Sequence, residues 1–518
     1  MQWSGRPLAM MCLLMALLQA AVLYTTFGVA LGDIPDEGTI ALQALRVAQG
    51  QIPHRDYFLQ TPLASDVWVG LWFRLFGSSL ESLRAYFFLE MALMAALIEL
   101  LSTRLLPRRW SEIPALWFLC HYPFGWYIAS ARWDGAFWIL AALVSLRDTR
   151  WRLVTGVLVG LAALTQHTAG AAAFAAVTVA VTAQAGPWKS KLQELRWFAW
   201  GVVLVWFPFV LFLFAYDSVS LFFYDTIFFN LTSYAQAHRM SIQWWLLLDN
   251  FRAALAVYQN SGDLLTFFLL LGYAIVDLGT FGLWFPLTAV GTARALFLRD
   301  CDQLALALTL AFLTLLELVR PNHYHFNFHS PLVVILWVVL ARAGRGPGKL
   351  ALALLSVGHV LVLAGHLQSS QFCNQVVGMP KGVLHLRGPE RAEALREIVR
   401  VNHQIPPQEK LFVFPDDPLL QWLLGRPPVT REVAAFPCFY TYDQFQAIRQ
   451  ALKEEGVENL LYVPMNFDFR AYPGISEAQH HREETWLLLY LTQGYHPYRK
   501  VAGLTFYRRD GLADPGKP

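Results

Sequence analysis

Two adjacent carboxylates, Asp36 and Glu37, follow an apolar stretch (8–31) that is long enough to cross a bilayer. Carboxylates at a membrane boundary are costly unless water, a cation or a reaction keeps them there. Low-dielectric surroundings raise the pKa of a carboxylate toward the working pH, which suits a general base that takes a proton from a hydroxyl group. The pair is the strongest candidate for such a base, and a solvated loop between two helices is the alternative.

A third carboxylate, Asp134, follows Arg132 at the start of another apolar stretch (133–147). It could supply a second acid to the same site. Alternatively, it is an acid at a helix N-terminus, where it stabilises the helix dipole.

Several arginines lie on the same predicted face of the membrane as these acids. Arginine binds phosphate oxygens in a bidentate way, and a departing lipid phosphate needs such neutralisation. As a set these arginines favour a phosphate site, although each alone could instead pair with an acid or a lipid headgroup. They are Arg46, Arg55, Arg132, Arg239 and Arg320.

Further polar candidates occupy two other segments of this face. Gln166 and His167 end a glycine-rich span and either cap it or reach the site. His323 and Tyr324 belong to a segment (321–329) with three histidines, whose spacing fits no zinc pattern. We therefore predict no metal site and no cofactor, although a divalent cation remains compatible with the sequence.

The composition places these residues in a membrane protein. Of the 518 residues, 56% are hydrophobic and only 15% are charged, whereas soluble domains have about 25% charged residues. The formal net charge of +3 says little about partners, and we predict membrane lipids but no nucleic acid among them.

Apolar segments predict a bundle of about eleven to thirteen membrane spans. Two amphipathic segments, Thr39–Ala48 and Pro62–Phe76, instead predict helices that lie in the membrane plane. The candidate spans are 8–31, 83–106, 112–130, 133–147, 152–168, 169–185, 195–216, 264–298, 303–319, 330–342 and 348–367.

Basic residues cluster in every second loop, which marks the cytoplasmic side. The N-terminus is then cytoplasmic, while the first loop (32–63) and the tail (368–518) are extracytoplasmic, as expected for a protein of the inner, or cell, membrane. The clusters are Arg104–Arg109, Arg147–Arg152, Lys189–Arg196, Arg294–Arg299 and Arg342–Lys349.

The tail from residue 368 reads as a separate α/β domain after a membrane domain of residues 1–367. Short apolar runs at Leu411–Pro415 and Asn459–Pro464 predict strands, and 494–509 predicts a closing hairpin. Cys373 and Cys438 would meet oxidising conditions there, so they either form a disulfide or remain two buried thiols.

The chain resembles the GT-C glycosyltransferases, and more closely the bacterial members of glycosyltransferase family 39, which include the enzyme that adds aminoarabinose to lipid A. The likeness covers nearly the whole chain. The similar stretches are Asp36-Glu37, Gly50–Phe58, Thr61-Pro-Leu, Phe76-Gly with Leu83-Arg84, Ala131-Arg-Trp-Asp, Gly160–Ala169, Arg320–Tyr324 and Pro415–Arg431.

The resemblance implies an inverting transfer of a sugar from a polyprenyl-phosphate carrier to a lipid, glycan or protein acceptor. It gives Asp36 the role of general base, assisted by Glu37, with Asp134 as a further acid. Arg55 and Asp56 would join the carrier-binding set with the other polar candidates. The sequence departs from the family pattern at Gln60-Thr61 and Gln166-His167, where a basic residue is common.

Three functions compete on this basis. The favoured one is the glycosyltransferase. A transporter or lipid flippase needs polar groups in mid-membrane and repeated halves, and the sequence shows no repeat. In the third, a catalytically inactive membrane scaffold, the acidic pair would be dispensable.

Overall fold

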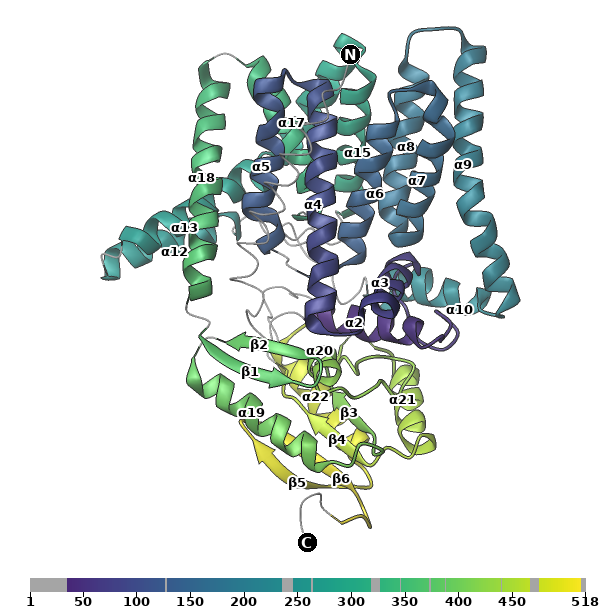
Figure 1. Ribbon diagram of the computed structural model, residues 1–518, viewed down its shortest axis with the longest axis vertical. Helices are drawn as coiled ribbons and strands as arrows, with labels where there is room; N and C mark the ends of the chain where they lie inside the picture. The colour runs from purple at the N-terminus through teal and green to yellow at the C-terminus, as the bar shows by residue number, and fades with distance from the viewer. Residues whose placement is uncertain are drawn as a thin grey trace.

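The computed structural model describes residues 35–125, 128–234, 246–261, 264–317, 327–344, 346–371, 374–386, 388–438, 440–465 and 475–513. Upright helices form a bundle, and an α/β domain lies below it (Figure 1). The sequence predicts this architecture correctly. The first apolar stretch, 8–31, is outside the described residues.

Two helices of the first loop lie across the lower ends of the upright helices, between the bundle and the α/β domain (Figure 1). These are α2 (Pro35–Ala48) and α3 (Ala64–Phe76). Helix α2 begins four residues earlier than the predicted Thr39, because Pro35 suits a first helical position and the acids of the first turn complement the helix dipole. Asp36 and Glu37 are therefore helical residues rather than loop residues.

The upright helices follow the predicted apolar segments within a few residues. Some of these helices begin at a polar N-cap residue. At the start of α4, for example, the Ser79 hydroxyl accepts a hydrogen bond from the backbone N–H of Ser82. The helices are α4 (Leu80–Leu105), α5 (Arg108–Gly125), α6 (Ala131–Ser145), α7 (Arg152–Thr165), α8 (His167–Ala183), α9 (Trp188–Ala215), α15 (Cys301–Glu317), α17 (Ser330–Ala343) and α18 (Gly346–Gln371).

Within the described residues, three helices are long and apolar enough to cross a membrane: α4, α9 and residues 348–365 of α18. Helices α8, α15 and α17 are apolar but shorter. The count of eleven to thirteen spans stays a prediction.

The long apolar segment 264–298 is divided into two α-helices, because a π-helical turn interrupts it. The remaining helices and turns of the membrane part are η1 (Thr149–Trp151), α10 (Val219–Phe223), η2 (Tyr224–Phe228), η3 (Asn230–Tyr234), α12 (Leu246–Ser261), α13 (Leu264–Asp277), η4 (Leu278–Gly282) and α14 (Trp284–Leu298).

The C-terminal domain contains a four-stranded sheet in the order β3-β4-β6-β5, which is parallel between β3 and β4 and antiparallel elsewhere. A separate antiparallel hairpin, β1–β2, and helices α20 and α22 have no counterpart in the sequence-based prediction. The elements are β1 (Gln375–Met379), β2 (Gly382–Leu386), α19 (Pro389–Gln404), β3 (Leu411–Phe414), α20 (Pro418–Leu423), α21 (Tyr442–Glu454), β4 (Asn459–Tyr462), α22 (Glu477–Leu491), β5 (Tyr495–Val501) and β6 (Leu504–Arg509).

The first-loop helices share a hydrophobic core with the C-terminal domain. Ala41 and Leu42 of α2 are fully buried in the same cluster as Leu419 of α20. Phe73 of α3 stacks on Trp422 of α20 with ring centroids 6.1 Å apart. Because apolar burial of this kind drives association, the loop and the C-terminal domain pack as one unit beneath the bundle.

Candidate functional site

The two acids at the start of α2 have different surroundings. Asp36 is exposed. Glu37 is only 2% exposed, and its two carboxylate oxygens each accept a hydrogen bond of 3.1 Å from the Arg84 guanidinium group of α4. A bidentate pair of this kind is rigid and strong. It anchors the first turn of α2 to the membrane bundle, whereas the Asp36 side chain beside it is exposed.

The C-terminal domain approaches the same turn of α2 with two further acids. Asp416 and Asp417 precede α20, and the Asp417 carboxylate accepts a hydrogen bond of 2.8 Å from the backbone N–H of Leu420. Burial raises the pKa of Asp416 well above its usual range, and the nearby Asp36 carboxylate raises it further. Burial also raises the pKa of Asp417, to about 6. Asp36 therefore belongs to a group of three carboxyl groups from two domains.

A buried ionic network joins the first loop, the turn η2 after α10 and the C-terminal domain. Asp225 of η2 lies 3.2 Å from the His54 ring nitrogen Nδ1, and both side chains are fully buried. The Arg431 guanidinium group donates to both Asp225 oxygens, at 3.0 and 2.8 Å, and to the His54 carbonyl oxygen at 2.7 Å. These contacts hold His54 at φ 66°, which a non-glycine residue adopts at a cost. Burial lowers the pKa of His54.

The predicted phosphate-binding residues of the first loop bind other protein groups. Arg46 is buried and donates to the backbone carbonyls of Asp56 and Thr430, and burial lowers its pKa to about 10. Arg55 is exposed and pairs with the Asp56 carboxylate at 2.7 Å. The hydrogen bond from Arg55 lowers the pKa of Asp56. Of the two arginines Arg46 and Arg55, Arg55 is thus the one that a ligand can reach.

Asp134 lies in a cluster of polar groups from α3, α4 and α6. The Ser65 hydroxyl donates to its carboxylate at 2.5 Å, and the Tyr86 hydroxyl donates at 2.7 Å. The Glu90 carboxyl group of α4 lies against it. The structure thus surrounds Asp134 with partners other than the acids around Asp36.

The remaining candidates of the bundle lie near Asp134 in the chain or in space. Arg132 is in the first turn of α6, where its backbone N–H donates to the Ser130 hydroxyl, and its guanidinium carbon lies 5.6 Å from the ring centroid of Phe328. Gln166, between α7 and α8, packs near Gly135, where an added Cβ would lie 3.5 Å from its Oε1 atom. His167 is exposed at the first position of α8. The predicted residues Arg320, His323 and Tyr324 lie outside the described residues, as does Arg239.

No family model matches the sequence, and no curated protein matches it. Solved structures do resemble the chain. The crystal structure of ArnT from Cupriavidus metallidurans bound to undecaprenyl phosphate matches with a TM-score of 0.62 and 13% sequence identity over 100% of both chains. The oligosaccharyltransferase of Archaeoglobus fulgidus, solved with a tethered acceptor peptide, matches with a TM-score of 0.52 and 13% identity over 98% of this chain and 74% of the other. The chain has the GT-C fold. At this identity the likeness concerns the fold alone.

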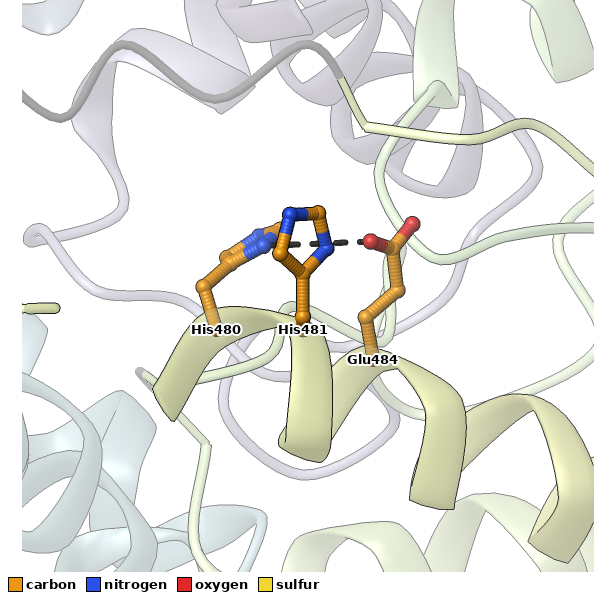
Figure 2. A group of neighbouring side chains, drawn as sticks. All are labelled: His480, His481 and Glu484. Carbon is orange, nitrogen blue, oxygen red and sulfur yellow. Dashed lines mark ion pairs between the residues drawn. The ribbon is translucent and has the colours of Figure 1, made fainter. Parts of the chain in front are cut away.

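One group within the described part of this GT-C fold has the donor atoms for a divalent cation. His480, His481 and Glu484 of α22 each offer an atom within 4.8 Å of the others (Figure 2). His480 and Glu484 are buried, whereas His481 is 65% exposed. Tyr462 and the Met465 N–H already donate to one Glu484 oxygen, at 2.9 and 3.0 Å. Because all three donors come from one helix, a cation here would stabilise α22 without bridging the two domains.

The sequence-based site omits Glu90, Asp225 and Arg431. Glu90 and Asp225 each stand in an apolar segment, where an acid is costly unless it has a partner or a function, so their positions carried a signal. Arg431 ends the stretch Pro415–Arg431, which resembles the family, but only the fold brings it beside a residue 206 positions earlier in the chain. Of the two cysteines that could form a disulfide, Cys438 has a free thiol. Cys373 lies outside the described residues.

Proposed function

We propose that this protein is a membrane glycosyltransferase that moves a sugar from a polyprenyl-phosphate carrier to a lipid, glycan or protein acceptor on the extracytoplasmic side. The reaction inverts the anomeric centre. The acceptor oxygen forms a bond to the anomeric carbon while the bond from that carbon to the phosphate oxygen breaks. The acceptor proton passes to Asp36, and the polyprenyl phosphate leaves.

One observation carries this proposal: Asp36 is exposed in the first turn of α2, where the membrane bundle meets the C-terminal domain, while Glu37 beside it is locked to Arg84. A general base must reach its substrate and must be held in place, and this turn meets both conditions. The likeness in fold to a protein bound to undecaprenyl phosphate supports the choice of carrier.

The neighbouring acids suit Asp36 to this role. Because half-buried Asp416 favours its protonated form, it can donate a hydrogen bond instead of adding a second negative charge. Asp36 can then accept the acceptor proton. Among the predicted arginines in the described part of the first loop, exposed Arg55 can meet the carrier phosphate. Arg132 and Arg320 are further candidates for this role.

This chemistry requires a particular orientation. We place the protein in the cell (inner) membrane with a cytoplasmic N-terminus and an extracytoplasmic C-terminal domain, because a lipid-linked sugar is used at the membrane face to which α2 belongs. The charge pattern of the loops supports this orientation. No cofactor takes part in the proposed step.

The direct test is a transfer assay with purified full-length protein in lipid nanodiscs. Labelled polyprenyl-phosphate sugars are added with a mixed lipid and peptide acceptor pool, and release of carrier phosphate is measured with time. We expect release that depends on the acceptor. Movement of intact carrier across proteoliposomes without release would instead indicate a flippase, and neither activity across the donor panel would indicate a scaffold.

A further inference from the structure

A groove on the membrane side of α3 is not part of the site around Asp36. It has a volume of about 270 Å³, and one face each of α3, α4 and α6 lines it. The leucines at its rim are exposed: Leu71, Leu75, Leu89 and Leu93 are 41%, 76%, 48% and 45% exposed. Because α4 is long and apolar enough to cross a membrane, the groove opens toward lipid chains.

Polar groups lie at the inner end of this apolar groove. Asp134 and Glu90 both line it, and both are buried, at 3% and 6% exposure. Ser65 and Tyr86 already donate to Asp134. The Glu90 carboxyl group lies against Asp134, but it has no hydrogen bond from another described group, and the buried Trp68 Nε1 has no acceptor among the described residues. Buried polar atoms without partners call for an explanation, and a ligand would supply one.

The charge of the groove selects the kind of ligand. No lysine or arginine is among the residues that line it, all of which the structure describes. A pair of carboxyl groups favours a hydrogen-bond donor and disfavours a phosphate, which would bring like charge into a low-dielectric site. The carrier phosphate therefore does not fit this end of the groove, whereas a hydroxyl group does. The volume lies near the lower limit for small-molecule sites, which suits one hydrocarbon chain with a small head.

We propose that this groove binds the acceptor, and that the acceptor is a lipid with an uncharged head that bears several hydroxyl groups, one of which meets Asp134 and Glu90 while another is the nucleophile at Asp36. Calling the ligand an acceptor rests on the proposed glycosyl transfer. The existence of a lipid-binding site is argued from the groove alone. Helix α4 contributes residues to both the groove and the reaction site. Tyr86 lies two residues after Arg84, the partner of Glu37, so one helical turn carries contacts to both.

Photo-crosslinking of the full-length protein in nanodiscs tests this proposal. Two probes are compared: a long-chain alcohol with a diazirine in its chain, and the phosphate monoester of the same alcohol. Mass spectrometry locates the labelled residues. We expect the alcohol to label α3, α4 and α6 about tenfold more than the phosphate does, which corresponds to about 1.4 kcal/mol. Equal labelling by both probes, or labelling spread evenly over the lipid-facing helices, would overturn the proposal.

Two variants sharpen the test. Leu89→Trp fills the groove from its lipid-facing side and should reduce labelling there several-fold, whereas Leu204→Trp on the exposed face of α9 is the matched control and should not. Glu90→Gln replaces one of the two carboxyl groups by an amide and should narrow the difference in labelling between the two probes. Unchanged labelling in Leu89→Trp contradicts the proposal even if Glu90→Gln does not fold.

The crosslinking result is independent of the transfer assay. If alcohol labels the groove but no carrier phosphate is released with any donor, the glycosyltransferase proposal fails and the lipid site stands. If transfer occurs while the groove selects neither probe, the transferase stands and the acceptor site proposed here is wrong.

Discussion

Gly38 of α2 lies directly against the backbone of Leu419 in the C-terminal domain: a Cβ added at Gly38 would lie 1.9 Å from the Leu419 nitrogen. No side chain can move aside to make room, because the obstacle is backbone. The contact is one residue away from Glu37 and two away from Asp36, so it fixes how closely the C-terminal acids approach the first turn of α2.

Gly38→Ala should therefore separate α2 from α20. We expect a loss of stability of about 1–3 kcal/mol, as for overpacked cores, together with slower carrier-phosphate release. Thermal unfolding of the nanodisc-embedded protein and the transfer assay measure the two effects. Gly378→Ala is the matched control, because nothing lies within 4 Å of a Cβ added there. Equal melting temperatures for the two variants would refute the close contact.

Asp36→Asn keeps the shape of the side chain and removes its charge. If Asp36 is the general base, turnover should fall by roughly 100- to 10,000-fold, while thermal stability and carrier binding stay near normal. Asp33→Asn, which changes an acid outside the adjacent pair, should have a far smaller effect. Near-normal transfer by Asp36→Asn would move the role to another acid, with Glu37 and Asp134 next in line.

Asp225→Asn should destabilise the contact between the first loop and the C-terminal domain. It leaves Arg431 without its counter-charge and weakens the contact to the strained His54, and removing one partner of a buried ion pair costs about 3–5 kcal/mol. Because Arg431 is 26% exposed, we expect the lower end of that range. The change in melting temperature measures it.

A surface ion pair provides the control for this variant. Arg150 pairs with Asp148 at 2.7 Å, and its side chain is 85% exposed. Asp148→Asn should cost less than about 1 kcal/mol, as is usual for exposed pairs. In a double-mutant cycle, Arg431→Met should add little once Asp225 is changed; additive effects would mean that the two residues act separately.

Asp417→Asn should make the protein less sensitive to pH. The folded-state pKa of about 6 exceeds the ordinary value of 3.8, so the stability that Asp417 contributes is greatest below about pH 4 and is lost as the pH rises through 6. The asparagine stays neutral and still caps α20. Its advantage over the native protein should grow from near zero at low pH to on the order of 3 kcal/mol above pH 7. Melting curves across this range give the difference, and an advantage that shrinks with rising pH would contradict the assignment.

The orientation of the chain gives an independent prediction. A reporter enzyme that is active only outside the cytoplasm should be active when it is fused after Pro518, and a reporter active only in the cytoplasm should be inactive there. The reverse pattern would place α2 and Asp36 on the cytoplasmic face and remove the basis for the proposed reaction.

Local pattern was sufficient to predict most of the elements. The apolar segment at 83–106 corresponds to α4 (Leu80–Leu105), and the amphipathic segment Pro62–Phe76 corresponds to α3. The predicted strands and closing hairpin of the tail are also present. Hydrophobic periodicity, turn residues and caps act within a few positions of the chain, so they can be read without knowing the fold.

The sequence by itself determined the membrane class, the in-plane helices and the acidic pair at the start of α2. Only the tertiary structure decided the partners: Glu37 with Arg84, Asp36 beside Asp416, and Asp225 with Arg431. These contacts join segments that are 47 to 380 positions apart. Their energies depend on the distance between charges and on burial, and both are fixed by packing between the bundle and the C-terminal domain, which no local pattern encodes.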